Sequence, residues 1–205
     1  MSTVPGRFIA FEGGEGSGKS TQAALLADAL GAVFTREPGG TAVGARIREL
    51  VLSPETGELD PRAEALLMAA DRAQHVAEVV APALAAGRHV VTDRFAGSSI
   101  AYQGYGRGLP VDEVAGLSRW ATNGSWPDLV VLLDVPAAVA DARLQRALDR
   151  MEAAGADFHR RVNDGFRELA AIEPDRWVLV DGSAAVAEVA DAVAAVVRQR
   201  LQLLS

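Results

Sequence analysis

A glycine-rich segment between an apolar strand and a helix constrains this chain more than any other feature. Residues 13–20, Gly-Gly-Glu-Gly-Ser-Gly-Lys-Ser, fit the pattern G-x-x-x-x-G-K-[S/T]. An apolar run at residues 8–11 precedes the segment, and a helical pattern over about residues 19–30 follows it, which is the context that supports such a motif. The glycines let backbone N–H groups face phosphate oxygens, and the helix start adds partial positive charge. The sequence therefore predicts a phosphate-binding loop for a nucleoside triphosphate.

The side chains of this loop predict separate tasks. Lys19 is the only lysine among the 20 basic residues, which marks a position where arginine does not serve. We expect its ammonium to bridge the β- and γ-phosphates and the Ser20 hydroxyl to ligate Mg²⁺. Asp93, which follows a strand pattern at residues 89–92, is the second expected Mg²⁺ ligand. The residues expected to bind ATP are Gly13, Gly14, Glu15, Gly16, Ser17, Gly18, Lys19, Ser20 and Thr21.

Apolar strand patterns alternate with helical patterns along the whole chain. Further strands are predicted at residues 32–35, 89–92, 129–133 and 177–180, and further helices at 44–52, 63–86 and 184–203. Strands that are apolar throughout indicate a parallel sheet covered by helices on both faces. Ligands of such sheets bind beyond the carboxyl ends of the strands. We predict an α/β fold of the P-loop NTPase class, as one domain over residues 1–205.

Composition excludes several classes of protein. Cysteine is absent, which excludes disulfides, thiolate zinc sites and cysteine nucleophiles. The net charge of −7 argues against a nucleic-acid partner. There is no apolar run of the ~18 residues that a membrane span needs, and the N-terminus lacks the layout of a signal peptide. We expect a cytoplasmic protein with small-molecule substrates.

Arginines after the loop suggest a second anion in the site. A GTPase switch would need a second lysine to read the base, so a small kinase, a ligase or a regulatory ATPase remains. Arg94 directly follows Asp93 and is expected to point into the site. Arg143, Arg146 and Arg150 recur at spacings of three and four on a predicted helix, which places them near one face. That stripe is either a solvated surface or a second set of phosphate ligands.

Several longer motifs are similar to those of bacterial thymidylate kinases. Residues 11–21 resemble the phosphate-binding loop of that family, and Thr-Arg-Glu-Pro-Gly-Gly-Thr at 35–41 resembles its second signature. Asp-Arg-Phe at 93–95, with Tyr-Gln-Gly at 102–104, is similar to the third. Residues 127–129, 133–135 and 149–152 continue the match in the same order, so the resemblance covers essentially the whole chain. It implies phosphoryl transfer from MgATP to dTMP in dTTP synthesis, and a homodimer.

The resemblance also implies roles for individual residues. Arg94 would hold the dTMP phosphate, and Arg72 would reach the thymine carbonyl. A lid at about residues 142–155 would supply the transition-state arginine, Arg150 first and Arg146 second, and Arg143 would meet the adenine. The catalytic residues are then Lys19, Arg94, Arg150 and Arg146. The residues expected to bind dTMP are Glu15, Arg36, Glu37, Met68, Arg72, Arg94, Ser99, Tyr102 and Gln103.

One position departs from the family, and two competing functions remain. Met68 stands where many members carry an aromatic ring that stacks on thymine, one helical turn before Arg72. Met68 is therefore either a base contact or ordinary helix core. The competing functions are another nucleoside monophosphate kinase, acting on UMP, CMP or AMP, and a P-loop regulatory ATPase that works through a protein partner.

Overall fold

Five parallel strands form the centre of the molecule. The computed structural model describes residues 6–144 and 149–204. The strands stand in the order β2-β3-β1-β4-β5, and every pair is parallel. Their bounds are β1 Phe8–Glu12, β2 Val33–Arg36, β3 Val90–Asp93, β4 Leu129–Asp134 and β5 Trp177–Asp181. The predicted α/β fold and its apolar strands are confirmed.

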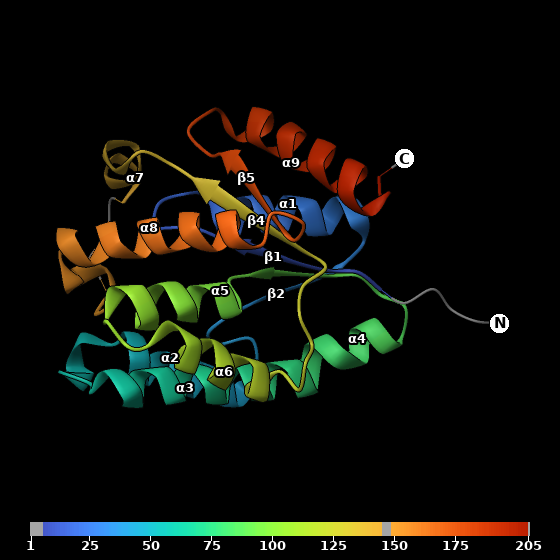
Figure 1. Ribbon diagram of the computed structural model, residues 1–205. Helices are drawn as coiled ribbons and strands as arrows, with labels where there is room; N and C mark the ends of the chain where they lie inside the picture. The colour runs from blue at the N-terminus through green and yellow to red at the C-terminus, as the bar shows by residue number, and fades with distance from the viewer. Residues whose placement is uncertain (1–5, 145–148, 205) are drawn as a thin grey trace.

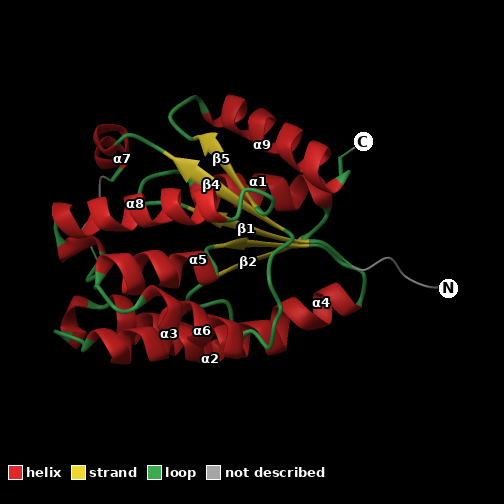
Figure 2. Cartoon of the chain, in the orientation of Figure 1, coloured by secondary structure: helices red, strands yellow, loops and turns green. Residues whose placement is uncertain are grey.

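Helices cover both faces of this sheet (Figures 1 and 2). One apolar core joins the sheet to α1 and α9, and the other joins it to α8, the α5–η3 segment and the η2–α4 segment. The helix bounds are α1 Lys19–Leu30, α2 Ala42–Leu52, η1 Pro54–Thr56, α3 Pro61–His75, η2 Val76–Val80, α4 Ala81–Ala85, α5 Ala96–Ser99, η3 Ile100–Gly106, α6 Val111–Ala121, α7 Ala137–Arg143, η4 Glu152–Ala154, α8 Ala156–Ile172 and α9 Val186–Leu201. Within the described ranges, no helix combines the length and the apolar character needed to cross a membrane.

The long helix predicted at residues 63–86 is present with a change of winding inside it. Asp60 caps its start, because the Asp60 carboxylate accepts hydrogen bonds from the backbone N–H of Arg62 and Ala63 at 2.9 and 3.3 Å. Helix α3 then passes into the π-helical turn η2 before α4 completes the run. The buried face of α3 carries Met68 and Arg72 toward the carboxyl ends of the strands.

A short helix after β3 was not predicted, and a buried carboxylate holds its start. The carboxylate of Glu12 accepts hydrogen bonds from the backbone N–H of Phe95 and of Ser98, each at 3.0 Å, and from the Ser98 hydroxyl at 2.6 Å. Burial raises the pKa of Glu12 to about 7, against the opposing effect of these hydrogen bonds. Since Glu12 ends β1, this residue fixes α5 and η3 against the strand that leads into the loop.

The predicted helix through Arg143, Arg146 and Arg150 is wrong. Helix α7 ends at Arg143, and Arg150 lies in a turn before η4. Arg146 lies outside the described residues. The two described arginines are drawn apart by different partners: Arg143 binds backbone carbonyl groups after β5, whereas Arg150 binds the carboxylate of Glu64 on α3.

Candidate active site

The glycine-rich loop runs from β1 to α1, and two of its glycines leave no room for a side chain. A Cβ added at Gly13 would lie 2.5 Å from the carbonyl oxygen of Leu133, and one at Gly16 would lie 2.5 Å from that of Ala140. Both glycines also have positive φ angles, 142° and 70°. Only glycine fits at these two positions, because the backbone of neighbouring segments approaches closely there.

Lys19 begins α1 and turns back over the loop. Its ammonium donates to the carbonyl oxygen of Gly14 at 2.5 Å and to the Ser17 hydroxyl at 3.2 Å. Burial, reinforced by the charge of Arg94, lowers the pKa of Lys19 to about 8. Both of these hydrogen-bond partners are neutral, and a buried ammonium with neutral partners is well suited to bind a phosphate anion.

Ser20 and Asp93 join the loop to the neighbouring strand β3. The Ser20 hydroxyl donates to Asp93 Oδ2 at 2.5 Å. Oδ1 of Asp93 is buried and has no hydrogen-bond partner among residues 6–144 and 149–204. Oxygen donors beside phosphates are what Mg²⁺ prefers, so the residues present fit the metal that the sequence predicts.

Arg94 lies beside the loop in a network of polar groups. Its guanidinium donates to the carbonyl oxygen of Gly13 and the Ser98 hydroxyl, both at 3.1 Å, and to the Tyr102 hydroxyl at 3.2 Å. It also forms an ion pair with Glu15, whose carboxylate accepts a hydrogen bond from Tyr102. Burial opposes ionisation of Glu15, but the charges of Arg94 and Lys19 prevail and lower its pKa to about 2. Arg94 has a φ of 70°, a strained conformation for an arginine, of the kind that clusters at functional sites.

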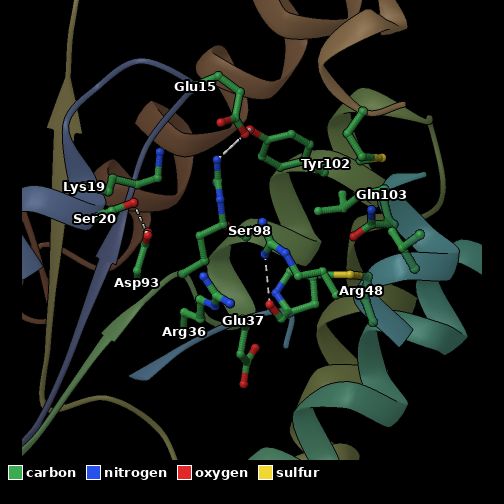
Figure 3. A pocket seen from close by; sticks show the side chains of 16 residues that line it. Glu15, Lys19, Ser20, Arg36, Glu37, Arg48, Asp93, Ser98, Tyr102 and Gln103 are labelled. Carbon is green, nitrogen blue, oxygen red and sulfur yellow. Dashed lines mark hydrogen bonds and ion pairs between the residues drawn. The ribbon is translucent and has the colours of Figure 1, made fainter. Parts of the chain in front are cut away.

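A pocket beyond the strand ends brings ten of the predicted site residues together. Figure 3 shows Lys19, Ser20 and Asp93 on one side of this pocket and Gln103 on the other. The predicted residues that line it are Glu15, Lys19, Ser20, Arg36, Glu37, Met68, Asp93, Arg94, Tyr102 and Gln103. Its cations come from separate elements, so the fold concentrates positive charge in a protein whose net charge is −7.

Arg72 and Ser99 lie behind the pocket wall, not in it. Arg72 is fully buried, and its guanidinium donates to Glu37 at 2.9 Å, to Ser99 at 3.0 Å and to Ser118 at 3.2 Å. Glu37 lines the pocket and also binds His75, at 2.8 Å. The structure therefore makes Glu37 the link between Arg72 and the pocket.

The two described arginines of the predicted lid lie in different surroundings. Arg143 donates to the carbonyl oxygen of Gly182 at 2.9 Å and to that of Gly16 at 3.4 Å, which places it beside the glycine-rich loop. Arg150 donates to the carbonyl oxygen of Val51 at 2.7 Å and to the carboxylate of Glu64 at 2.5 Å. Arg150 thus binds the same carboxylate as Gln103, which places it on the Gln103 side of the site.

Sequence reasoning missed six residues that line the pocket: Pro38, Arg48, Val51, Leu52, Ser98 and Met151. Arg48 donates to the carbonyl oxygen of Pro38 at 3.0 Å, and burial together with the charge of Arg36 lowers its pKa. A signal for Arg48 was available, because it lies on the predicted helix that follows the Arg-Glu-Pro-Gly-Gly-Thr motif.

Comparisons with known proteins agree with this geometry. The family model described as thymidylate kinase matches residues 11–193. A curated thymidylate kinase from Leifsonia xyli is 54% identical over 194 residues, covering 91% of each chain. One from a Synechococcus strain is 51% identical over 201 residues, covering 96% of each chain.

A solved structure supports the same assignment. The crystal structure of thymidylate kinase from Ehrlichia chaffeensis superposes with a TM-score of 0.79 at 31% sequence identity. The match covers 95% of this chain and all of that one, so the two chains share the same overall fold. On the family match and these relatives, the chain belongs to the thymidylate kinase family.

Proposed function

We propose that the chain is an ATP-dependent nucleoside monophosphate kinase that phosphorylates dTMP to dTDP, a step in dTTP synthesis. The observation that carries this proposal is one pocket with the phosphate and metal ligands Lys19, Ser20 and Asp93 on one side and the amide of Gln103 on the other. Two phosphate groups can share its centre, because Lys19, Arg36, Arg48 and Arg94 all line it. The family and its curated relatives support dTMP as the acceptor.

On the donor side, the loop amides and Lys19 bind the phosphates of ATP. Ser20 and Asp93 would hold Mg²⁺, which when bound neutralises charge on the β- and γ-phosphates. Thr21, the residue after Ser20 on α1, is also assigned to ATP binding. Arg143 lies beside the loop on the carbonyl groups of Gly182 and Gly16, and we assign it to the adenine side.

On the acceptor side, Arg94 with Arg36 and Arg48 binds the dTMP phosphate. Glu15 and Tyr102 face the sugar, and Met68 and Gln103 face the base. No protein nucleophile is needed, because an oxygen of the dTMP phosphate attacks the γ-phosphorus and ADP leaves. The chain's contribution is positioning and charge neutralisation.

The transition-state arginine is proposed to come from the lid at about residues 142–155. The variable loop positions Gly14, Glu15, Gly16 and Ser17 carry no cation, so the charge that develops on the transferred group needs another donor. Arg150 is the candidate among the described residues, and reaching the phosphates requires that it leave Glu64.

We also propose a homodimer through the layer of α2, α3 and α6, which pack together on one side of the molecule (Figure 1). Each helix leaves a large apolar side chain exposed there: Leu50, Leu66 and Trp120 at 51%, 58% and 80%. A second copy of the chain would cover them. Sedimentation of the wild type and of Trp120→Glu tests this, since the variant is expected to shift toward monomer.

The function is tested by ADP release with and without dTMP. The kinase proposal predicts dTMP-dependent ADP release and formation of dTDP in equal amounts. ATP hydrolysis at the same rate with and without dTMP would indicate a regulatory ATPase. A preference for UMP, CMP or AMP in the same assay would indicate another monophosphate kinase. The cytoplasm is the proposed compartment, since the reaction consumes ATP and a cysteine-free chain suits a reducing environment.

A further inference from the structure

A buried carboxylate lies behind the base end of the pocket. Glu64 on α3 is fully buried and does not line the pocket. It accepts hydrogen bonds from Gln103 at 3.0 Å, from Arg107 at 3.0 and 3.1 Å, and from Arg150 at 2.5 Å. Burial opposes its ionisation, but the hydrogen bonds from Arg107, Gln103 and Arg150 keep its pKa below the usual value. Glu64 is therefore an anion that can only accept hydrogen bonds.

This anion decides which way the amide of Gln103 points. A carboxylate offers no proton, so the N–H side of the Gln103 amide must face Glu64. The carbonyl oxygen, Oε1, then faces away from Glu64, and Gln103 lines the pocket (Figure 3). That oxygen is buried and lacks a hydrogen-bond partner within the part of the chain that the structure describes. A buried acceptor without a partner is costly, so it is suited to accept a hydrogen bond from a bound ligand.

The position of Glu64 on α3 places this arrangement beside the base. Glu64 and Met68 are four residues apart and share one helix face. Met68 lines the pocket together with Gln103. Arg107, which neutralises part of the charge of Glu64, is itself held over the ring of Phe158 at 4.6 Å from its centre. Arg107 is thus held by the ring of Phe158 as well as by the carboxylate of Glu64.

We propose that Glu64 is a positioning residue that sets base selectivity: it holds Gln103 so that an acceptor faces the pocket. This inference rests on the proposed function and deepens it. The pocket then favours a pyrimidine whose ring nitrogen carries a proton, the imide of thymine or uracil. Cytosine presents an unprotonated ring nitrogen at that edge, which would oppose the Gln103 oxygen.

The test compares three substrates in two variants. dUMP shares the imide edge of dTMP and lacks only its methyl group, whereas dCMP differs at the hydrogen-bonding edge. In Glu64→Gln the new amide can donate as well as accept, so the side-chain amide of Gln103 is free to rotate and present its N–H side to the pocket. The ratio of kcat/KM for dUMP over dCMP is expected to fall by about 10-fold or more, as for loss of one buried hydrogen bond. The ratio for dTMP over dUMP, which reports the methyl contact, should stay unchanged.

Arg107→Met is the matched control, because it removes another partner of Glu64 and leaves the contact with Gln103. It should lower the melting temperature and leave both substrate ratios unchanged. The loss of the Arg150 contact in Glu64→Gln affects all three substrates alike and cancels in the ratios. An unchanged dUMP-to-dCMP ratio in Glu64→Gln, or an equal fall in Arg107→Met, overturns the inference.

A measurement on the wild-type protein covers the case in which Glu64→Gln does not fold. The side-chain amide protons of Gln103, assigned by comparison with Gln103→Met, should keep their NMR shifts when dUMP binds, since they stay on Glu64. A large shift would mean that the amide donates to the base, which contradicts the proposal. Failure of the proposed function is a separate result, because it would appear as no dTMP-dependent ADP release in the wild-type chain.

Discussion

Ser20 and Asp93 come from different elements, α1 and the end of β3, and their side chains meet with the Ser20 hydroxyl donating to Oδ2 of Asp93 at 2.5 Å. The other carboxylate oxygen of Asp93 is buried beside them, without a partner in the described ranges. We expect Asp93→Asn to raise the Mg²⁺ concentration for half-maximal activity by about 10–100-fold, because a charged oxygen near the metal is lost. Magnesium titrations of activity measure this. Asp128→Asn, a surface change that affects the ion pair with Arg7, serves as the control and should leave the titration unchanged.

Lys19→Ala should lower kcat by about 100-fold or more, since one preorganised charge on the transferred phosphate is lost. The melting temperature should change little, because the ammonium of Lys19 donates hydrogen bonds to Gly14 and Ser17 of the loop itself. Lys19→Arg should rescue poorly, since the planar guanidinium is larger than the ammonium that the loop encloses. Turnover above about a tenth of wild type in Lys19→Ala, a loss below 1.4 kcal/mol, would contradict the role of the loop.

The variant Arg150→Ala distinguishes two possible roles of Arg150, a catalytic contact with the phosphates and a structural ion pair with Glu64. If Arg150 leaves Glu64 to meet the phosphates, the variant should lose about 10³-fold in kcat with little change in the KM for dTMP. Single-turnover and steady-state kinetics measure both quantities. If Arg150 serves only as an anchor on Glu64, the melting temperature falls instead and kcat is retained.

Met68 tests whether the base contacts a side chain of α3. Met68→Phe should lower the KM for dTMP modestly, because stacking on a base is worth about 1–3 kcal/mol, against about 0.3–1.5 kcal/mol for a sulfur contact. Met68→Ala should raise that KM and leave the KM for ATP unchanged. Met68 also packs with Ile47 and Val51, so its loss destabilises the fold. Ile47→Ala is the control, since Ile47 belongs to the same cluster but does not line the pocket.

Glu12 gives the protein a pH-dependent stability of unusual sign. Its pKa is about 7 in the folded protein, because of burial, against an ordinary value of 4.5. Between these values the folded protein keeps a proton that the unfolded chain has released, so stability falls as the pH rises. Glu12→Gln removes this dependence, so its stability relative to the wild type should increase as the pH rises from below 4.5 to above 7, by about 3 kcal/mol in total at 1.36 kcal/mol per pKa unit.

Urea denaturation at several pH values measures this difference. Asp71, whose pKa burial raises to about 6, contributes a slope of the same sign in both proteins and cancels when they are compared. A constant stability gap between Glu12→Gln and the wild type across that range would show that Glu12 does not titrate there.

The sequence predicted the parts of the molecule that local patterns determine. The strand at residues 8–11, the loop and the helix at 19–30 follow from apolar runs, glycines and helical spacing, and the structure has them as β1 Phe8–Glu12 and α1 Lys19–Leu30. Residues next to these elements, such as Ser20 and Asp93, could be placed in the site because the carboxyl ends of parallel strands share one edge.

The positions of side chains whose partners lie far away in the sequence could not be predicted. Arg150 was expected on a helix with Arg143, but its carboxylate partner, Glu64, is 86 positions away in the chain. Arg72 was expected in the pocket. Its guanidinium instead donates hydrogen bonds to Glu37, Ser99 and Ser118 behind the pocket wall. Spacing along a chain identifies which residues share a helix face, and it does not identify which buried anion a given arginine will meet.

Glu12 ends the strand that feeds the glycine-rich loop, and the same carboxylate holds the start of the helix that carries Ser98 and leads to Tyr102. In the proposed site, the loop that binds ATP and the segment that carries Tyr102 toward dTMP therefore share one anchor, the carboxylate of Glu12. This shared anchor restrains the separation between the proposed donor and acceptor sites. Substitutions at the base end of the pocket can therefore change which monophosphate is accepted without altering the separation between the donor and acceptor phosphates.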